Sequence, residues 1–134
     1  EKDALAWICG ELCDVPNSIS EAGAWIKDHF SDSVVELRHA AQALDELVVQ
    51  KEQTLRSQIS LLSEKEKSLM RAIAERKFVT HFASKEFLSE VKTVASATRK
   101  IVAKLEDRGL LEWEPKRGTR LSNPLLGHFL RRNR

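Results

Sequence analysis

The chain has 134 residues, of which 42% are hydrophobic and 31% are charged, and its formal net charge is +2 at pH 7. These values are typical of a folded globular protein and exclude a disordered chain. No apolar run approaches the roughly 20 residues that a membrane-spanning helix needs, so we expect no membrane partner and a cytoplasmic location. The sequence begins Glu-Lys-Asp, without an initiator Met or a secretory segment, and we therefore expect a piece of a longer protein.

The charge is distributed unevenly along the chain. Residues 1–62 hold 5 Lys/Arg against 11 Asp/Glu, a net charge of −6, whereas residues 63–134 hold 17 against 9, a net charge of +8. This asymmetry predicts two modules, a helical subdomain over 1–62 and a second domain over 63–134. The basic second domain is the candidate for binding nucleic acid, because neutralising phosphates supplies most non-specific affinity.

Residues 24–108 contain neither Gly nor Pro, and this absence predicts helices joined by short polar turns over that stretch. A first helix is expected from about Asp3 to Cys13. The capping box Ser18–Glu21 predicts a second helix that extends to about Phe30, and a further capping box, Ser33–Glu36, opens the longest helix, which extends to about residue 62.

The longest helix carries an incomplete seven-residue repeat. Polar Lys51 and Gln58 interrupt a seam that otherwise consists of Val34, Leu37, Ala41, Leu44, Val48, Leu55 and Leu62. Because polar residues at such positions weaken a coiled coil, the pattern favours a helix that bridges the two modules of a monomer. A coiled-coil dimer is the alternative.

The basic half predicts three helices in succession. The capping box Ser63–Glu66 opens a helix whose inward residues are Leu69, Met70, Ile73 and Ala74. Ser84 caps a short helix that carries Phe87, Leu88 and Val91. Ser96 is predicted to cap the third helix, which is amphipathic, ends before Gly109 and buries Ala97, Ile101, Val102 and Leu105.

Two short extended runs and a final helix follow. Residues 110–114 and 119–121 read as strands on either side of a Pro-Lys-Arg-Gly turn, and Asn123-Pro124 begins a last helix with Leu125, Leu126, Phe129 and Leu130 on one face. This order of helices, strand, basic turn and strand is the order of a winged helix-turn-helix, a fold that presents one helix and one loop, the wing, to a nucleic acid or a protein.

The exposed face of the third helix and the wing supply the predicted DNA contacts. The residues are Ser96, Arg99, Lys100 and Lys104 on the helix and Lys116, Arg117 and Arg120 in the wing. Trp113 alternates with Glu112 and Glu114 and is therefore predicted to face the core. The two carboxylates would repel phosphates unless they point away from the contact surface.

No catalytic or metal site is predicted. His29, His39, His81 and His128 are scattered over different segments, and Cys9 and Cys13 stand one helical turn apart without further ligands nearby. We expect two half-buried thiols in a reducing compartment and no cofactor in this chain.

Four segments of the basic half, in order, resemble the C-terminal winged helix of archaeal-type P-loop ATPases. They are Leu62–Ala74, Ser84–Leu88, Ser96–Leu111 and Ser122–Arg132, about half of the chain. The resemblance implies that residues 1–61 are lid helices and that ATP and Mg²⁺ are bound by a domain upstream. This chain lacks the G-x-x-x-x-G-K-[S/T] phosphate loop, so we expect no hydrolysis by the chain itself.

Together these features predict a mainly α protein in which a helical, lid-like subdomain precedes a winged helix-turn-helix with a small β-wing. Binding of duplex DNA is the first functional hypothesis. A regulatory module that docks on its own ATPase domain or on a partner protein is the second, and a small dimeric transcription regulator is the third.

Overall fold

A computed structural model describes residues 2–30 and 37–132 of the chain. The described part is mainly helical and contains one two-stranded antiparallel sheet. Its elements are α1 (Lys2–Glu11), α2 (Pro16–Phe30), α3 (Leu37–Ser60), α4 (Glu64–Arg76), α5 (Lys85–Val91), α6 (Ala95–Asp107), β1 (Leu111–Glu114), β2 (Gly118–Leu121) and α7 (Pro124–Arg132). Within these residues, no helix is both long enough and apolar enough to cross a membrane.

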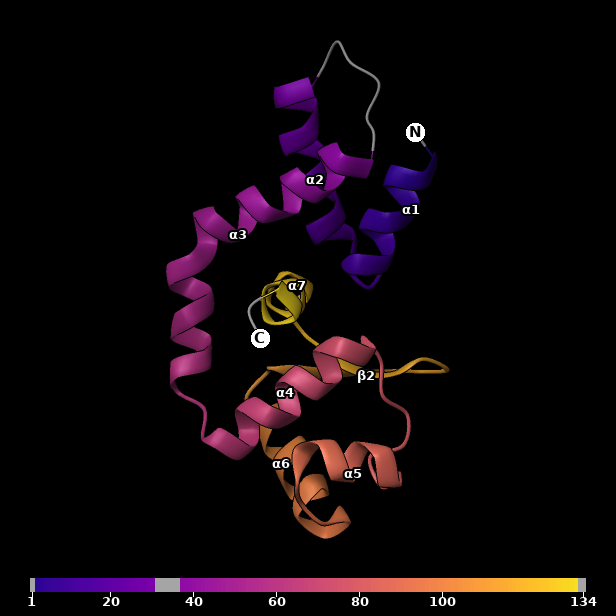
Figure 1. The fold of residues 1–134 in the computed structure, drawn as a ribbon, viewed down its shortest axis with the longest axis vertical. Coiled ribbons are helices and arrows are strands. Elements are labelled where there is room, and N and C mark those ends of the chain that lie inside the picture. The colour runs from indigo at the N-terminus through magenta and orange to yellow at the C-terminus, as the bar shows by residue number, and fades with distance from the viewer. Residues whose placement is uncertain (1, 31–36, 133–134) are drawn as a thin grey trace.

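The helices form two groups joined by α3 (Figure 1). Helices α1 and α2 lie with the first half of α3 at one end, and α4, α5 and α6 lie at the other. Helix α3 runs from the first group to the second, and α7 lies between the groups and contacts both α3 and α4. One continuous cluster of buried residues extends through both groups, so the predicted modules share a core.

Helices α1 and α2 are joined by a tight turn. Cys13 and Asp14 adopt left-handed backbone angles, with φ of 53° and 57°, and Pro16 takes the first position of α2. Proline suits that position because the helix needs no N–H there. The second helix therefore begins two residues before the predicted Ser18, whereas the predicted box Ser33–Glu36 lies outside the described residues.

Helix α3 buries one face against other helices of the same chain. Its buried residues are Ala40, Ala43, Leu44, Leu47 and Leu55, and it contacts α1, α2 and α7. Three of the predicted seam positions, Leu44, Leu55 and Leu62, are buried, while Leu37 is exposed. Lys51 pairs with Glu21 of α2 at 2.7 Å. Within one chain, α3 thus connects the two groups of helices; whether it also pairs with a second chain stays a prediction.

Helices α4 and α5 begin as their capping residues predict. The Ser63 hydroxyl accepts from the backbone N–H of Glu66, and the Glu66 carboxylate accepts from that of Ser63 at 2.8 Å. Ser84 likewise accepts from the backbone N–H of Phe87. The apolar face predicted for the first of these helices is buried, at Leu69, Met70, Ile73 and Ala74.

The prediction that Ser96 caps the third helix is wrong. Helix α6 begins at Ala95 after the N-cap Val94, which makes no side-chain cap. The Thr98 hydroxyl instead donates to the Val94 carbonyl at 3.0 Å, and Thr98 is fully buried. Three residues, of which Lys92 is left-handed (φ 54°), separate α5 from α6.

Strands β1 and β2 pair in an antiparallel hairpin with Leu111 opposite Leu121 and Glu114 opposite Gly118. The hairpin gains a third partner that the sequence analysis missed. Val79, after α4, exchanges two backbone hydrogen bonds with Thr119, each 2.9 Å long. Gly118 allows this approach, because a Cβ there would lie 2.6 Å from the Val79 carbonyl oxygen.

Helix α7 begins and packs as predicted. The Asn123 side chain accepts from the backbone N–H of Leu125 at 3.1 Å, and Pro124 takes the first helical position. All four predicted apolar residues are buried, at Leu125, Leu126, Phe129 and Leu130.

Candidate nucleic-acid interface

The exposed face of α6 carries Ser96, Arg99, Lys100 and Lys104, as the sequence predicts. It points away from the shared core, where Thr98, Val102 and Leu105 are buried. Among the residues that the structure describes, Arg99 and Lys100 have no ion-pair or hydrogen-bond partner. Two adjacent basic side chains without a partner in that part of the chain make this exposed face attractive to an anion.

Lys104 lies one turn further along and has a weak partner. Its ammonium is 3.7 Å from the carboxylate of buried Glu66, which Arg108 approaches to 3.6 Å. The backbone hydrogen bond from Ser63, more than these charges, holds the pKa of Glu66 below its usual value. The Lys104 side chain stays 64% exposed, so it can turn towards a second anion at small cost.

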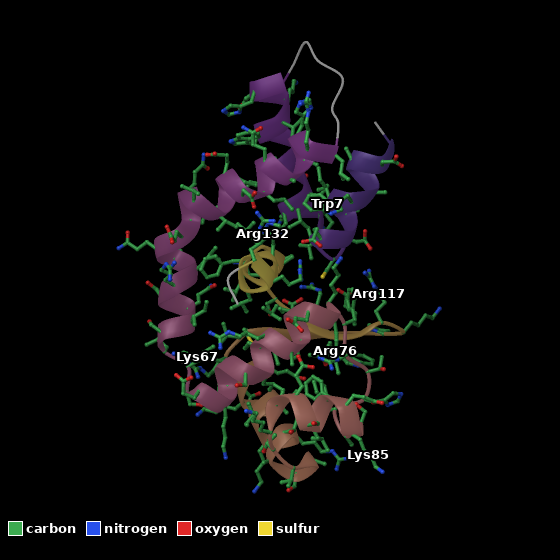
Figure 2. All side chains as sticks on the ribbon, in the orientation of Figure 1. Trp7, Lys67, Arg76, Lys85, Arg117 and Arg132 are labelled. Carbon is green, nitrogen blue, oxygen red and sulfur yellow. The ribbon has the colours of Figure 1, made fainter. Side chains whose placement is uncertain are left out.

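Of the two basic residues at the hairpin tip, the first is exposed to solvent and the second forms an ion pair. Lys116 is exposed at the turn. Arg117 instead pairs with Asp14 at 3.1 Å, and its guanidinium lies 4.1 Å from the centre of the Phe78 ring. Figure 2 places Arg117 between the hairpin and the end of α1. This contact fastens the hairpin to the first group of helices.

Arg120 is not available to a phosphate, contrary to the sequence prediction. Only 8% of the residue is exposed, and its guanidinium donates to Glu112, to Glu114 and to the Leu121 and Ser122 carbonyls. The hairpin register places Arg120 directly opposite Glu112, so a buried arginine neutralises the two carboxylates that the sequence analysis had counted against DNA binding.

Trp113 is exposed, so the prediction that it faces the core is also wrong. The alternation is right: Trp113 shares a hairpin face with buried Leu111, but the core does not reach as far as Trp113, which is 64% exposed. The indole borders a groove of about 350 Å³ between α6 and the hairpin. Arg99, Val102 and Glu106 of α6 line one side of the groove, and Phe82 and Thr119 also line it.

A second polar cluster, which no local sequence pattern predicts, joins the two groups of helices. Glu11 at the end of α1 contacts His128 at 2.8 Å and Arg131 at 3.0 Å, both on α7, and Lys77 at 3.2 Å. The second ring nitrogen of His128 faces Asp45 at 3.4 Å. In the described part of the chain, no three His, Cys, Asp or Glu residues are placed to hold a metal ion. The cluster is a set of structural ion pairs.

Comparisons with protein-family models, with curated proteins and with solved structures find no match to this chain.

Proposed function

We propose that residues 63–132 form a winged helix-turn-helix that binds duplex DNA, with α6 as the helix that enters the major groove. The observation that carries this proposal is the exposed, basic first half of α6. Arg99 and Lys100 have no partner among the described residues, although most basic side chains of the hairpin and of α7 are held in ion pairs. Charges left free on one helix face indicate a ligand that carries the opposite charge.

The order and spacing of the elements support this fold. Helix α5 is followed after three residues by α6, a spacing that helix-turn-helix units use. Helix α6 is followed by a hairpin whose second strand, β2, is bridged to the segment after α4. The four segments that resemble archaeal-type P-loop ATPases lie on α4, α5, α6 and α7, in that order.

The proposed contacts divide into two kinds. Arg99 stands where a side chain can reach a base edge, since the early residues of a recognition helix do so in many complexes. Lys100, Lys104 and Lys116 are proposed to meet phosphates, which fix the position of the helix but carry no sequence information. Arg120 is left out because it is buried, and Arg117 contributes only if its pair with Asp14 opens.

Salt-dependent binding tests the proposal. If about four cations meet phosphates, the logarithm of the affinity should fall with the logarithm of the salt concentration at a slope near −3.6. Lys100→Ala should weaken all duplex sequences alike and flatten the slope by about one unit. Lys27→Ala is the matched control: it removes the same charge from an exposed position on α2 and should change nothing.

Absence of binding at low salt, or equal losses in the Lys100 and Lys27 variants, would contradict the proposal. The regulatory module that docks on an ATPase domain or on a partner protein would then be the better hypothesis. An ATPase domain that precedes this chain and binds ATP and Mg²⁺ is proposed on the sequence resemblance alone. Finding a phosphate loop encoded upstream of Glu1 would test it.

A further inference from the structure

Trp113 is the largest exposed aromatic side chain beside the proposed DNA surface. It is 64% exposed, although the residue opposite it on the hairpin, Thr119, is buried. Leaving an indole in water forgoes a large hydrophobic gain, so an exposed indole at the edge of a groove suggests a ligand with a flat apolar face.

The same groove contains a free cation. Arg99 lines it and has no partner among the described residues, and Lys100 lies next to it on the exposed face of α6. An aromatic platform beside unpartnered basic side chains is the combination that single-stranded nucleic acids use, since the base stacks while the phosphate meets the charge.

From this juxtaposition we infer that Trp113 stacks on an unpaired DNA base, so that the preferred ligand is a duplex with a single-stranded end and not a blunt duplex. This inference rests on the proposed function, and it names the class of DNA. Bases inside a duplex are stacked on both faces, and the outer face of a terminal pair is fixed in orientation by its pairing, whereas an unpaired base can turn a free face to the indole.

The charges that line the groove also indicate how the unpaired DNA strand is oriented in it. Arg99 and Glu106 line the groove from positions two turns apart on α6, about 10 Å along the helix axis. A phosphate is attracted to Arg99 and repelled by Glu106, so at a single-stranded end Arg99 meets the phosphate of the unpaired nucleotide, whereas within a continuous duplex it meets a base edge. Phe82 gives the groove a fixed wall, because its ring packs edge-to-face on buried Phe87 at 5.4 Å.

Fluorescence of Trp113 tests the contact directly. Trp7 and Trp25 are replaced by Phe, which leaves Trp113 as the single tryptophan of the chain. The protein is titrated at low salt with a blunt duplex and with the same duplex carrying a short thymidine overhang. We expect the overhang to quench Trp113 and the blunt duplex to leave it nearly unchanged.

Affinities of variants separate stacking from charge. Trp113→Ala should weaken binding of the overhang duplex about 5- to 150-fold, the equivalent of roughly 1–3 kcal/mol per stacked base, while blunt-duplex affinity and the salt slope stay the same. Trp113→Phe should retain most of the preference. Trp25→Ala is the control, since Trp25 lies on α2 and stacks on His29.

The outcomes distinguish this inference from the proposed function. Equal affinity for both duplexes, or no effect of Trp113→Ala on the overhang duplex, overturns the inference while DNA binding stands, and it leaves the groove to a protein partner. Failure of both duplexes to bind at low salt overturns both.

Discussion

Arg120 joins the two strands of the hairpin through its side chain. Its guanidinium donates to Glu112 and Glu114 on the neighbouring strand, to the carbonyl of Leu121 on its own strand and to that of Ser122 just after it. Removing one partner of a fully buried ion pair costs roughly 3–5 kcal/mol, but Glu112 is largely exposed, so solvent screening reduces the loss.

We therefore expect Arg120→Ala to lower the free energy of unfolding by about 2 kcal/mol. Urea denaturation measures it, with Lys116→Ala, an exposed position at the hairpin tip, as the control. An Arg120→Ala protein as stable as the parent, with weakened DNA binding, would restore Arg120 as a contact residue.

Gly118 is required for a different reason. Its φ of 109° disfavours any other residue, and a Cβ would come within 2.6 Å of the Val79 carbonyl oxygen. Gly118→Ala should cost about 2 kcal/mol or more. Gly109→Ala is the matched control, because Gly109 also has a positive φ, 77°, but nothing lies within 4 Å of its Cβ position. Gly109→Ala should lower the free energy of unfolding by about 1 kcal/mol. If thermal or urea unfolding shows equal losses of stability in the two variants, the close approach of Gly118 to Val79 is unimportant.

At the scale of elements, α7 connects the two groups of helices. Phe129 is buried on it, and Arg56 of α3 lies over its ring at 5.4 Å. Phe129→Ala should lower stability by about 3–5 kcal/mol, because the cavity lies between packed helices. Val49→Ala, on an exposed position of α3, should change stability by less than about 0.5 kcal/mol. An unchanged melting temperature for the Phe129 variant would show α7 to be peripheral.

The sequence predicted most elements well because their signals are local. The hydrogen bonds of Ser63 and Ser84 lie within three residues of each cap, and Pro124 limits its own backbone angle wherever it stands. The bridge at Val79 was missed because a single pair of bonded residues leaves no alternating pattern in the sequence.

The candidate site was predictable in part for the same reason. Periodicity identified the exposed face of α6, including Arg99 and Lys100. Periodicity could not show that Arg120 is buried. Its burial depends on the residue opposite it on β1 and on the parts of the protein that pack against the hairpin. Nor could periodicity show that Trp113 is exposed. Alternation tells which face of a strand a residue lies on, but not how far other parts of the protein cover that face.

At the scale of the whole molecule, Glu11 connects the two groups of helices through charge. The hydrogen bond from His128 holds the pKa of Glu11 well below its usual value, with Arg131 and Lys77 adding to the effect and partial burial opposing it. Because the folded-state pKa lies below the unfolded value of about 4.3, the contribution of Glu11 to stability is present above about pH 5 and is lost as the pH falls.

Glu11→Gln should therefore lower the free energy of unfolding at pH 7 by about 2–3 kcal/mol and reduce its dependence on pH below 5. Chemical denaturation at a series of pH values measures both effects. Glu46→Gln, at an exposed position on α3, should alter neither. A parent protein whose stability is unchanged between neutral and acidic pH would rule out this role of the ion pairs.

The whole chain is expected to be monomeric in dilute solution. Apolar residues of α3 that a coiled coil would need, such as Leu44 and Leu55, are buried against other helices of the same chain. Sedimentation at micromolar concentration should give the mass of one chain, 15.2 kDa. A stable dimer would favour the dimeric regulator.

The bridge between Val79 and Thr119 affects how the folded protein opens. Each residue donates its amide hydrogen to the carbonyl of the other, so a single separation of the hairpin from the segment after α4 frees both amides at once. Their exchange with solvent deuterium should then follow one common rate, whereas the amides bonded within the hairpin depend on fraying of the hairpin itself. The segment around Val79 and strand β2 are thus expected to separate and re-form as one cooperative unit.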